Sequence, residues 1–187
     1  MVKKGNIIFL MGTSSAGKTS LAKQLQVMNE ESYFHLELDV FENMAPEAHL
    51  EKSYWPTLAK SASAMHHCIA TFSDLGFHVI VDHVILDIPE EAGWLEECVL
   101  ALHMYPVLFV GVHCSLHELE RREQARGDRD IGQAKWQLDR VHRHGVYDVE
   151  VNTHDRTLAE CADEIMRKLQ DLNPTTSAFH TLYNRMA

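Results

Sequence analysis

Apolar residues along the chain gather in five short runs that are separated by stretches of helical periodicity. The runs occupy residues 6–11, 33–38, 77–81, 107–112 and 147–152. Runs of this length, bounded by glycine, proline or polar residues, are typical of buried strands. Between the runs, apolar residues recur every three or four positions, which predicts helices. Strands and helices that alternate in this way predict an α/β fold: a five-stranded parallel sheet with helices on both faces.

Local signals in the sequence place several helix ends. Two helices open with a capping box, at Ser115–Glu118 and at Thr157–Glu160, where a hydroxyl and a carboxylate satisfy the first backbone N–H groups. Pro174 ends the last predicted helix, and we expect a loose C-terminal tail over residues 174–187. Because no repeat, low-complexity segment or linker divides the chain, we expect a single domain over residues 1–187.

A glycine-rich loop follows the first apolar run at once. Residues 12–19 fit the phosphate-loop pattern G-x-x-x-x-G-K-[ST] without a mismatch. The loop lies between a predicted strand and a predicted helix, which is the context that this motif requires. A glycine turn before an ordinary helix is the alternative interpretation. The candidate nucleotide-binding residues are Gly12, Thr13, Ser14, Ser15, Ala16, Gly17, Lys18, Thr19 and Ser20.

These residue types suit the binding of a triphosphate. Glycine allows backbone conformations that a side chain would block, so successive N–H groups of the loop can point at one anion. The helix that begins after Gly17 adds the positive end of its dipole. Lys18 would reach the β- and γ-phosphates and act in catalysis, while the Thr19 hydroxyl would bind Mg²⁺. ATP and Mg²⁺ are therefore the cofactors that we expect.

Two further apolar runs lead into an aspartate. In a parallel sheet wrapped by helices, ligands bind at the carboxyl ends of the strands. Asp82 follows the third run and has the form of a strand-end carboxylate directed towards Mg²⁺; a turn or cap residue is the alternative. Asp39 follows the second run. It is either the base that takes the proton of an acceptor hydroxyl or the cap of a helix, since Asp39–Glu42 also makes a capping box.

The charge of the chain is negative overall but uneven. The formal net charge is −10, which argues against a nucleic-acid partner bound through a broad basic face. No lysine or arginine lies between Lys60 and Arg121, whereas seven crowd into residues 121–143. We assign Arg122 to nucleotide binding, and Arg126 and Arg129 to catalysis, on a lid over residues 122–136 that closes over the triphosphate. A solvated arginine face is the alternative.

Composition narrows the class of protein further. No apolar run approaches the roughly 20 residues of a membrane span, and the first strand begins too early for a signal peptide. We therefore expect a cytoplasmic protein without a membrane partner. The four cysteines are far apart in apolar patterns, which is typical of reduced core residues. His66-His67, His113 with His117, and His142 with His144 lack further ligands at metal-binding spacing, so we expect core or surface histidines.

A set of specific residues carries a family resemblance. It includes the Ser-Ser-Ala filling of the glycine loop, the strand-end Asp39 and Asp82, and the segment 111–153 with its Ala-Arg-Gly-Asp-Arg stretch at 125–129, and Gln137. On these residues the chain resembles the chloramphenicol phosphotransferase family of P-loop kinases, as far as about residue 162. The resemblance implies a nucleoside-monophosphate-kinase-like fold and transfer of the γ-phosphate of ATP to a small-molecule hydroxyl. It also implies that Asp39 is the catalytic base and that the lid arginines are Arg126 and Arg129.

The resemblance does not identify the acceptor. Residues 40–54 are fewer than the family's antibiotic-binding segment and differ from it in composition, so chloramphenicol itself does not follow. Phe41, Met44, Tyr54 and Trp55 could line an apolar acceptor site or belong to the core. Another small-molecule or nucleoside kinase, such as a shikimate- or adenylylsulfate-kinase-like protein, and a non-catalytic ATP-binding regulator are the alternatives. The expected partner is a small hydroxylated molecule, and a homo-oligomer is left open.

Overall fold

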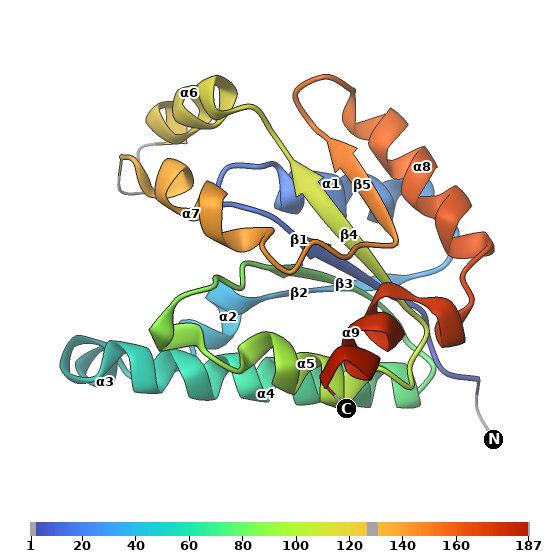
Figure 1. Ribbon diagram of the computed structural model, residues 1–187, viewed down its shortest axis with the longest axis horizontal. Coiled ribbons are helices and arrows are strands. Elements are labelled where there is room, and N and C mark those ends of the chain that lie inside the picture. Colours follow the sequence, from blue (N-terminus) through green and yellow to red (C-terminus); the bar gives the residue numbers. More distant parts are fainter. Residues whose placement is uncertain (1–2, 127–130, 187) are drawn as a thin grey trace.

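The structure, a computed structural model, describes residues 3–126 and 131–186 and builds them around one parallel sheet (Figure 1). The strands are β1 (Ile7–Met11), β2 (Tyr33–Glu37), β3 (His78–His83), β4 (Val107–His113) and β5 (Val149–Asn152). Their order across the sheet is β2-β3-β1-β4-β5, and all four pairings are parallel. The predicted five-stranded parallel sheet is therefore confirmed.

Helices connect the strands and cover both faces of the sheet. They are α1 (Lys18–Met28), α2 (Leu38–Glu42), α3 (Glu47–Lys52), α4 (Tyr54–Asp74), α5 (Trp94–Leu102), α6 (Leu116–Arg126), α7 (Gln133–Val141), α8 (Leu158–Gln170) and α9 (Ala178–Met186). Between the third and fourth strands, where the periodicity predicted a helix, the chain instead forms a short 3₁₀ turn, Pro89–Glu91, followed by α5. Gly93 causes this division because its φ of 86° lies in the left-handed region that interrupts a helix.

The alternation of side chains along β1 explains the two cores. Ile7, Phe9 and Met11 point to the face that α4, α5 and α9 cover. Ile8 and Leu10 point to the opposite face, against α1 and α8. Successive residues of a strand face opposite sides, and all five residues of this central strand are fully buried. β1 is thus the most enclosed strand, and the glycine loop extends directly from its carboxyl end.

The C-terminal segment differs from its prediction. We expected a loose tail, but residues 178–186 form α9, and Phe179 is fully buried against Phe9 and Phe109 at ring-centroid distances of 5.6 and 5.0 Å. Asp148 fastens the start of α9, because its Oδ1 accepts a 2.7 Å hydrogen bond from the backbone N–H of Ala178. The expectation was wrong because Pro174 opens a 3₁₀ turn that leads the chain back onto the sheet.

The carboxyl ends of β1, β2 and β3 meet at one edge of the sheet. In the strand register Asp82 lies beside both Leu10 of β1 and Glu37 of β2. The glycine loop, the first turn of α2 and the end of β3 therefore converge, as the topology of a parallel sheet requires.

Among the described helices, none combines the length and the apolar composition that a membrane span needs.

Candidate active site

The glycine loop has the backbone shape of an anion-binding concavity. Ser15 has a φ of 62° and Gly17 a φ of 91°, and left-handed residues at such positions are typical of loops whose N–H groups can converge on an anion. At Gly12 a Cβ atom would lie 2.4 Å from the carbonyl oxygen of Val112, which only glycine avoids. Helix α1 begins after Gly17 with no side-chain cap and no acidic residue in its first turn. The positive end of α1 is thus left to a ligand.

Lys18 and Thr19 both face Asp82. Lys18 is buried, and its Nζ donates a 2.9 Å hydrogen bond to the carbonyl oxygen of Thr13 and lies 3.5 Å from Oδ1 of Asp82. The Thr19 hydroxyl donates a 2.6 Å hydrogen bond to Oδ2 of Asp82. The two residues that the sequence suggested as Mg²⁺ ligands therefore lie in direct contact, and the ammonium of Lys18 lies beside the same carboxylate.

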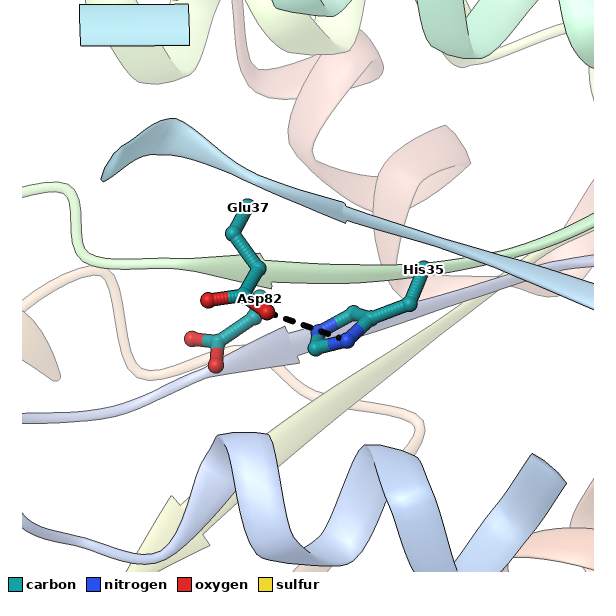
Figure 2. Close-up of side chains that lie close together, drawn as sticks. All are labelled: His35, Glu37 and Asp82. Atoms are coloured by element: carbon teal, nitrogen blue, oxygen red, sulfur yellow. Dashed lines mark ion pairs between the residues drawn. The ribbon is translucent and has the colours of Figure 1, made fainter. Parts of the chain in front are cut away.

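Glu37 and His35 extend this carboxylate group. Figure 2 shows the Glu37 and Asp82 carboxylates side by side, with the imidazole of His35 next to them. Nδ1 of His35 lies 3.2 Å from Oε1 of Glu37, and the three residues offer ligand atoms within 4.8 Å of one another. Two carboxylates and the Thr19 hydroxyl form a set of hard oxygen ligands, which fits Mg²⁺. Glu37 was not among the site residues that the sequence predicted. The available signal was that His35 and Glu37 are two positions apart on one strand, β2, and therefore face the same side of the sheet.

Asp39 is not the helix cap that one interpretation of the sequence suggested. Helix α2 begins one residue earlier, at Leu38, with Glu37 in the cap position and no side-chain cap hydrogen bond, so the capping-box interpretation is wrong. Asp39 is exposed in the first turn of α2, and it lines the main cavity. Burial and the Glu42 carboxylate, with smaller contributions from Asp39 and Glu91, raise the pKa of Tyr54 to about 12. These side chains therefore share one electrostatic environment.

The structure describes only part of the arginine-rich segment, residues 121–143. Arg122 donates from Nη1 to the Thr153 hydroxyl at 3.0 Å and, more weakly at 3.4 Å, to the Ser15 carbonyl oxygen. Its guanidinium thus braces the glycine loop from α6. Arg126 is the last residue of α6, and its side chain is outside the described part of the structure. Arg129 also lies outside the described residues, so the lid assignment of both arginines stays a prediction.

Two buried polar residues fix α7 in place, Gln137 against the glycine loop and Glu123 against α6, and sequence reasoning gave neither of them a role. Gln137 of α7 accepts a 2.6 Å hydrogen bond at Oε1 from the backbone N–H of Ser14. Glu123 of α6 accepts hydrogen bonds from the N–H groups of Gly132 and Ala134, at 2.5 and 2.8 Å, and so fixes the start of α7. Gln137 was visible in the sequence only as part of a family pattern, and Glu123 only as a helical glutamate.

Thr153 joins the same framework from the far side of the loop. Its hydroxyl lies 2.6 Å from the carbonyl oxygen of Ala16, and Arg122 donates to it and to its carbonyl oxygen. Thr153 directly follows the last strand. The sequence signal available for it was its position as a polar residue at the end of an apolar run. The glycine loop is therefore held from α6, from α7 and from the end of β5.

A cavity of about 640 Å³ joins these residues. The glycine loop and residues of α6 and α7 form one part of its lining. The opposite part, called here the α2–α4 wall, is formed by Asp39, Glu42, Tyr54, Trp55, Leu86 and Glu91. Among the aromatic and apolar candidates of the sequence, Tyr54 and Trp55 lie in this wall, whereas Phe41 packs against the core and Met44 is 69% exposed.

Two histidines and three of the four cysteines are buried. His66 and His83 are buried side by side with their Nε2 atoms 3.2 Å apart, and burial lowers the pKa of His66 to about 4. Of the described residues, only His35, Glu37 and Asp82 group as metal ligands would, so the histidine pairs singled out from the sequence do not. All four cysteines are free thiols.

Comparison with known proteins places this chain in a family. A family model described as chloramphenicol phosphotransferase-like protein matches residues 5–170. Two curated proteins from strains of Mycobacterium tuberculosis, named "Putative O-phosphotransferase MT2714" and "Putative O-phosphotransferase Rv2636", are each 30% identical to this chain. Each match covers 97% of this chain and 89% of the relative.

Solved structures share the fold. The APS kinase CysC of Mycobacterium tuberculosis, in complex with AMPPNP and APS, aligns with a TM-score of 0.67 at 20% identity over 89% of this chain and 98% of that one. Shikimate kinase from Acinetobacter baumannii with shikimate gives 0.64 at 13% identity, over 90% and 95%. A gluconokinase from Sinorhizobium meliloti 1021 gives 0.61 at 18% identity and covers both chains completely. The fold is that of the P-loop kinases.

Proposed function

Because the chain belongs to the chloramphenicol phosphotransferase-like family, we propose that it transfers the γ-phosphate of ATP to a hydroxyl group of a small molecule. One observation carries the proposal: a phosphate-binding loop and an exposed strand-end aspartate, Asp39, line the same cavity. The names of the two mycobacterial relatives support an O-phosphotransferase. An ATP-consuming reaction of this kind suits the cytoplasm, which we propose as its location.

The loop residues hold the nucleotide in this proposal. Backbone N–H groups of the glycine loop bind the phosphates, except that of Ser14, which donates to Gln137. Lys18 moves from the Thr13 carbonyl oxygen to the β- and γ-phosphates. Thr19 and Asp82 hold Mg²⁺, with Glu37 beside them. Bound Mg²⁺ would neutralise negative charge on the phosphates. Arg122 remains on the loop, where its contacts with Thr153 keep the loop in shape.

Asp39 acts as the base. Its carboxylate accepts the proton of the acceptor hydroxyl while that oxygen attacks the γ-phosphorus, and ADP leaves with the electrons of the broken P–O bond. Lys18 stabilises the charge that develops on the phosphates. Arg126 and Arg129 are proposed to close over the triphosphate and keep water from competing with the acceptor. The products are ADP and a phosphate monoester.

The test is phosphoryl transfer from γ-labelled ATP to a panel of small alcohols. We expect a labelled acceptor with the wild type and a loss of roughly 100-fold or more in kcat with Asp39→Asn. ATP binding, measured by calorimetry, should stay unchanged in that variant, whereas Lys18→Ala should weaken ATP binding whatever acceptor is present. Asp171→Asn, an exposed aspartate at the end of α8, serves as the control.

Two outcomes would contradict the proposal. ATP binding without transfer to any acceptor would favour a non-catalytic ATP-binding regulator. Transfer that is insensitive to Asp39→Asn would leave the reaction class intact but remove the assigned base. A panel that includes shikimate, APS and nucleosides separates this protein from other kinases of the same fold.

A further inference from the structure

The α2–α4 wall contains a buried carboxylate that faces the cavity. Glu91, in the 3₁₀ turn Pro89–Glu91, is only 7% exposed, yet it belongs to the cavity lining. Among the described residues, the backbone N–H of Leu86 is the one group that donates to its carboxylate, at 2.7 Å to Oε2. Burying an ionisable group with so little compensation is costly, so Glu91 is better explained by a ligand than by packing.

The environment of Glu91 disfavours the charged form of its carboxyl group. Burial raises the pKa of Glu91 to about 7, and the neighbouring Glu90 adds to this although the Leu86 hydrogen bond opposes it. A cation placed in the cavity next to Glu91 would stabilise the carboxylate, as an opposite charge does in any site of low dielectric constant. The described residues provide no such cation: no salt bridge to Glu91 is formed.

Positively and negatively charged side chains line different parts of the cavity. In the described lining, the three side chains that carry a fixed positive charge are Lys18, Arg121 and Arg122, and they belong to the glycine loop and α6. The α2–α4 wall instead contributes the carboxylates of Asp39, Glu42 and Glu91. All three influence the Tyr54 hydroxyl, which places them around one volume. A carboxylate, sulfate or phosphate group of the acceptor placed next to the Glu91 carboxylate would be repelled by it.

The wall also offers aromatic surface. Tyr54 and Trp55 lie edge to face with ring centroids 5.4 Å apart, and they are 44% and 37% exposed. Aromatic faces bind alkyl ammonium groups and the apolar faces of sugar rings through their negative charge density. Carboxylates beside exposed indole and phenol rings are the combination that selects an organic cation.

We propose that the α2–α4 wall binds an acceptor alcohol that also carries an amine, such as an amino alcohol or an amino sugar, with its ammonium held by Glu91 and packed against Tyr54 and Trp55. Asp39 then takes the proton of the hydroxyl that is phosphorylated. This inference rests on the proposed function. It distinguishes this protein from kinases of the same fold whose acceptors are anions.

The experiment compares acceptors of similar size and shape that differ in charge. Glucosamine, glucose and glucuronate form one matched set, and serinol, glycerol and glycerate form another. Each compound is tested for phosphorylation with labelled ATP and, separately, for binding to the Mg·ADP-loaded protein by calorimetry. We expect amines to bind best, followed by neutral compounds, with acids last.

Glu91→Gln tests the assigned residue, because glutamine keeps the shape and can still accept from Leu86. We expect this variant to lose roughly tenfold or more in affinity for the amines, the value of a charge-assisted hydrogen bond, with neutral alcohols and ADP unaffected. Where turnover occurs, the loss should fall on KM rather than kcat. Glu96→Gln, an exposed glutamate in the first turn of α5, is the control and should change none of these values.

The binding arm separates this inference from the proposed function. Amines that bind through Glu91 without being phosphorylated would support the recognition site and contradict the kinase. Phosphorylation that favours neutral or acidic alcohols would support the kinase and overturn the amine proposal. An equal loss for all three charge classes in Glu91→Gln would also overturn it, since that result assigns Glu91 a purely structural role.

Discussion

The backbone N–H of Ser14 donates a 2.6 Å hydrogen bond to Oε1 of Gln137, which joins the glycine loop to α7. Both residues are buried, and α7 is itself fixed to α6 by Glu123. The N–H of Ser14 belongs to the concave side of the loop, where a phosphate oxygen would otherwise accept from it. Helices α6 and α7 are therefore connected to the glycine loop by side-chain contacts in the described structure.

Removing this contact should destabilise the loop. In Gln137→Leu the Ser14 N–H loses its acceptor in a buried position, which costs about 1–3 kcal/mol in the free energy of unfolding. Urea denaturation of the nucleotide-free protein measures the loss. Lys135→Ala, on the exposed side of α7, is the matched control. Equal stabilities of Gln137→Leu and the control would show that the loop does not depend on α7.

The carboxylate pair at the ends of β2 and β3 predicts a graded effect on metal dependence. Asp82→Asn should raise the Mg²⁺ concentration for half-maximal activity, because it weakens both the oxygen ligand and the hydrogen bond to Thr19. Glu37→Gln should raise it less, since Glu37 stands beside Asp82 and already interacts with His35. Mn²⁺ binding followed by paramagnetic resonance gives a reading that does not depend on turnover.

Exposed Glu30→Gln is the control for both substitutions, since this residue precedes β2 and so lies beyond the opposite end of that strand from Glu37. If Glu37→Gln bound Mn²⁺ as the wild type does, the metal site would consist of Thr19 and Asp82 without Glu37.

The stability of the protein should depend on Glu91 in a pH-dependent way. The pKa of Glu91 is about 7 in the folded protein and near 4.5 when unfolded, so the unfolded chain releases its proton first as the pH rises. Stability that is fully present below pH 4.5 is therefore lost by about pH 7, by roughly 3 kcal/mol at most. Glu91→Gln removes this loss and should be more stable than the wild type at pH 8 but not at pH 4.5.

Urea denaturation at the two pH values, with Glu96→Gln as the reference, measures this difference. A gain in stability that is the same at both values would mean that Glu91 does not titrate in this range. If Glu91→Gln stabilises the fold but lowers the affinity for a ligand, the glutamate is retained for binding at a cost in stability.

The C-terminal helix should matter for folding. Phe179→Ala removes a fully buried ring that contacts Phe9 and Phe109, and such a deletion costs about 3–5 kcal/mol. Thermal unfolding followed by circular dichroism tests this, with the exposed Asn184→Ala on the same helix as the control. A Phe179→Ala protein as stable as the control would contradict the packing of α9 on the sheet.

The features that the sequence predicted well are those that local patterns determine. Five apolar runs became five strands, and the glycine loop follows β1 because its spacing and its glycines encode the turn directly. The capping box at Thr157 and Glu160 is present with both of its hydrogen bonds. In each case the residues that make the structure are neighbours in the chain.

The residues that were missed depend on contacts between distant segments. Glu37 becomes significant only through the pairing of β2 with β3, which places it beside Asp82. Gln137 is 123 residues from its partner Ser14, and no periodicity indicates that it faces the loop. Glu91 lies in a 3₁₀ turn that is separated from α5 at Gly93, and the helical periodicity of this stretch did not indicate that separation. The register of a sheet and the orientation of helices are properties of the whole fold, so a single sequence does not reveal them.

Helix α1 starts without any side-chain cap, and this has a thermodynamic consequence. An anion bound to its first amide groups would link occupancy of the loop to the folding equilibrium. At a nucleotide concentration about 100 times the dissociation constant, the linkage adds about 2.7 kcal/mol to the folded state. In a cell rich in triphosphates the ligand would thus serve the protein as a structural component before it serves as a reactant.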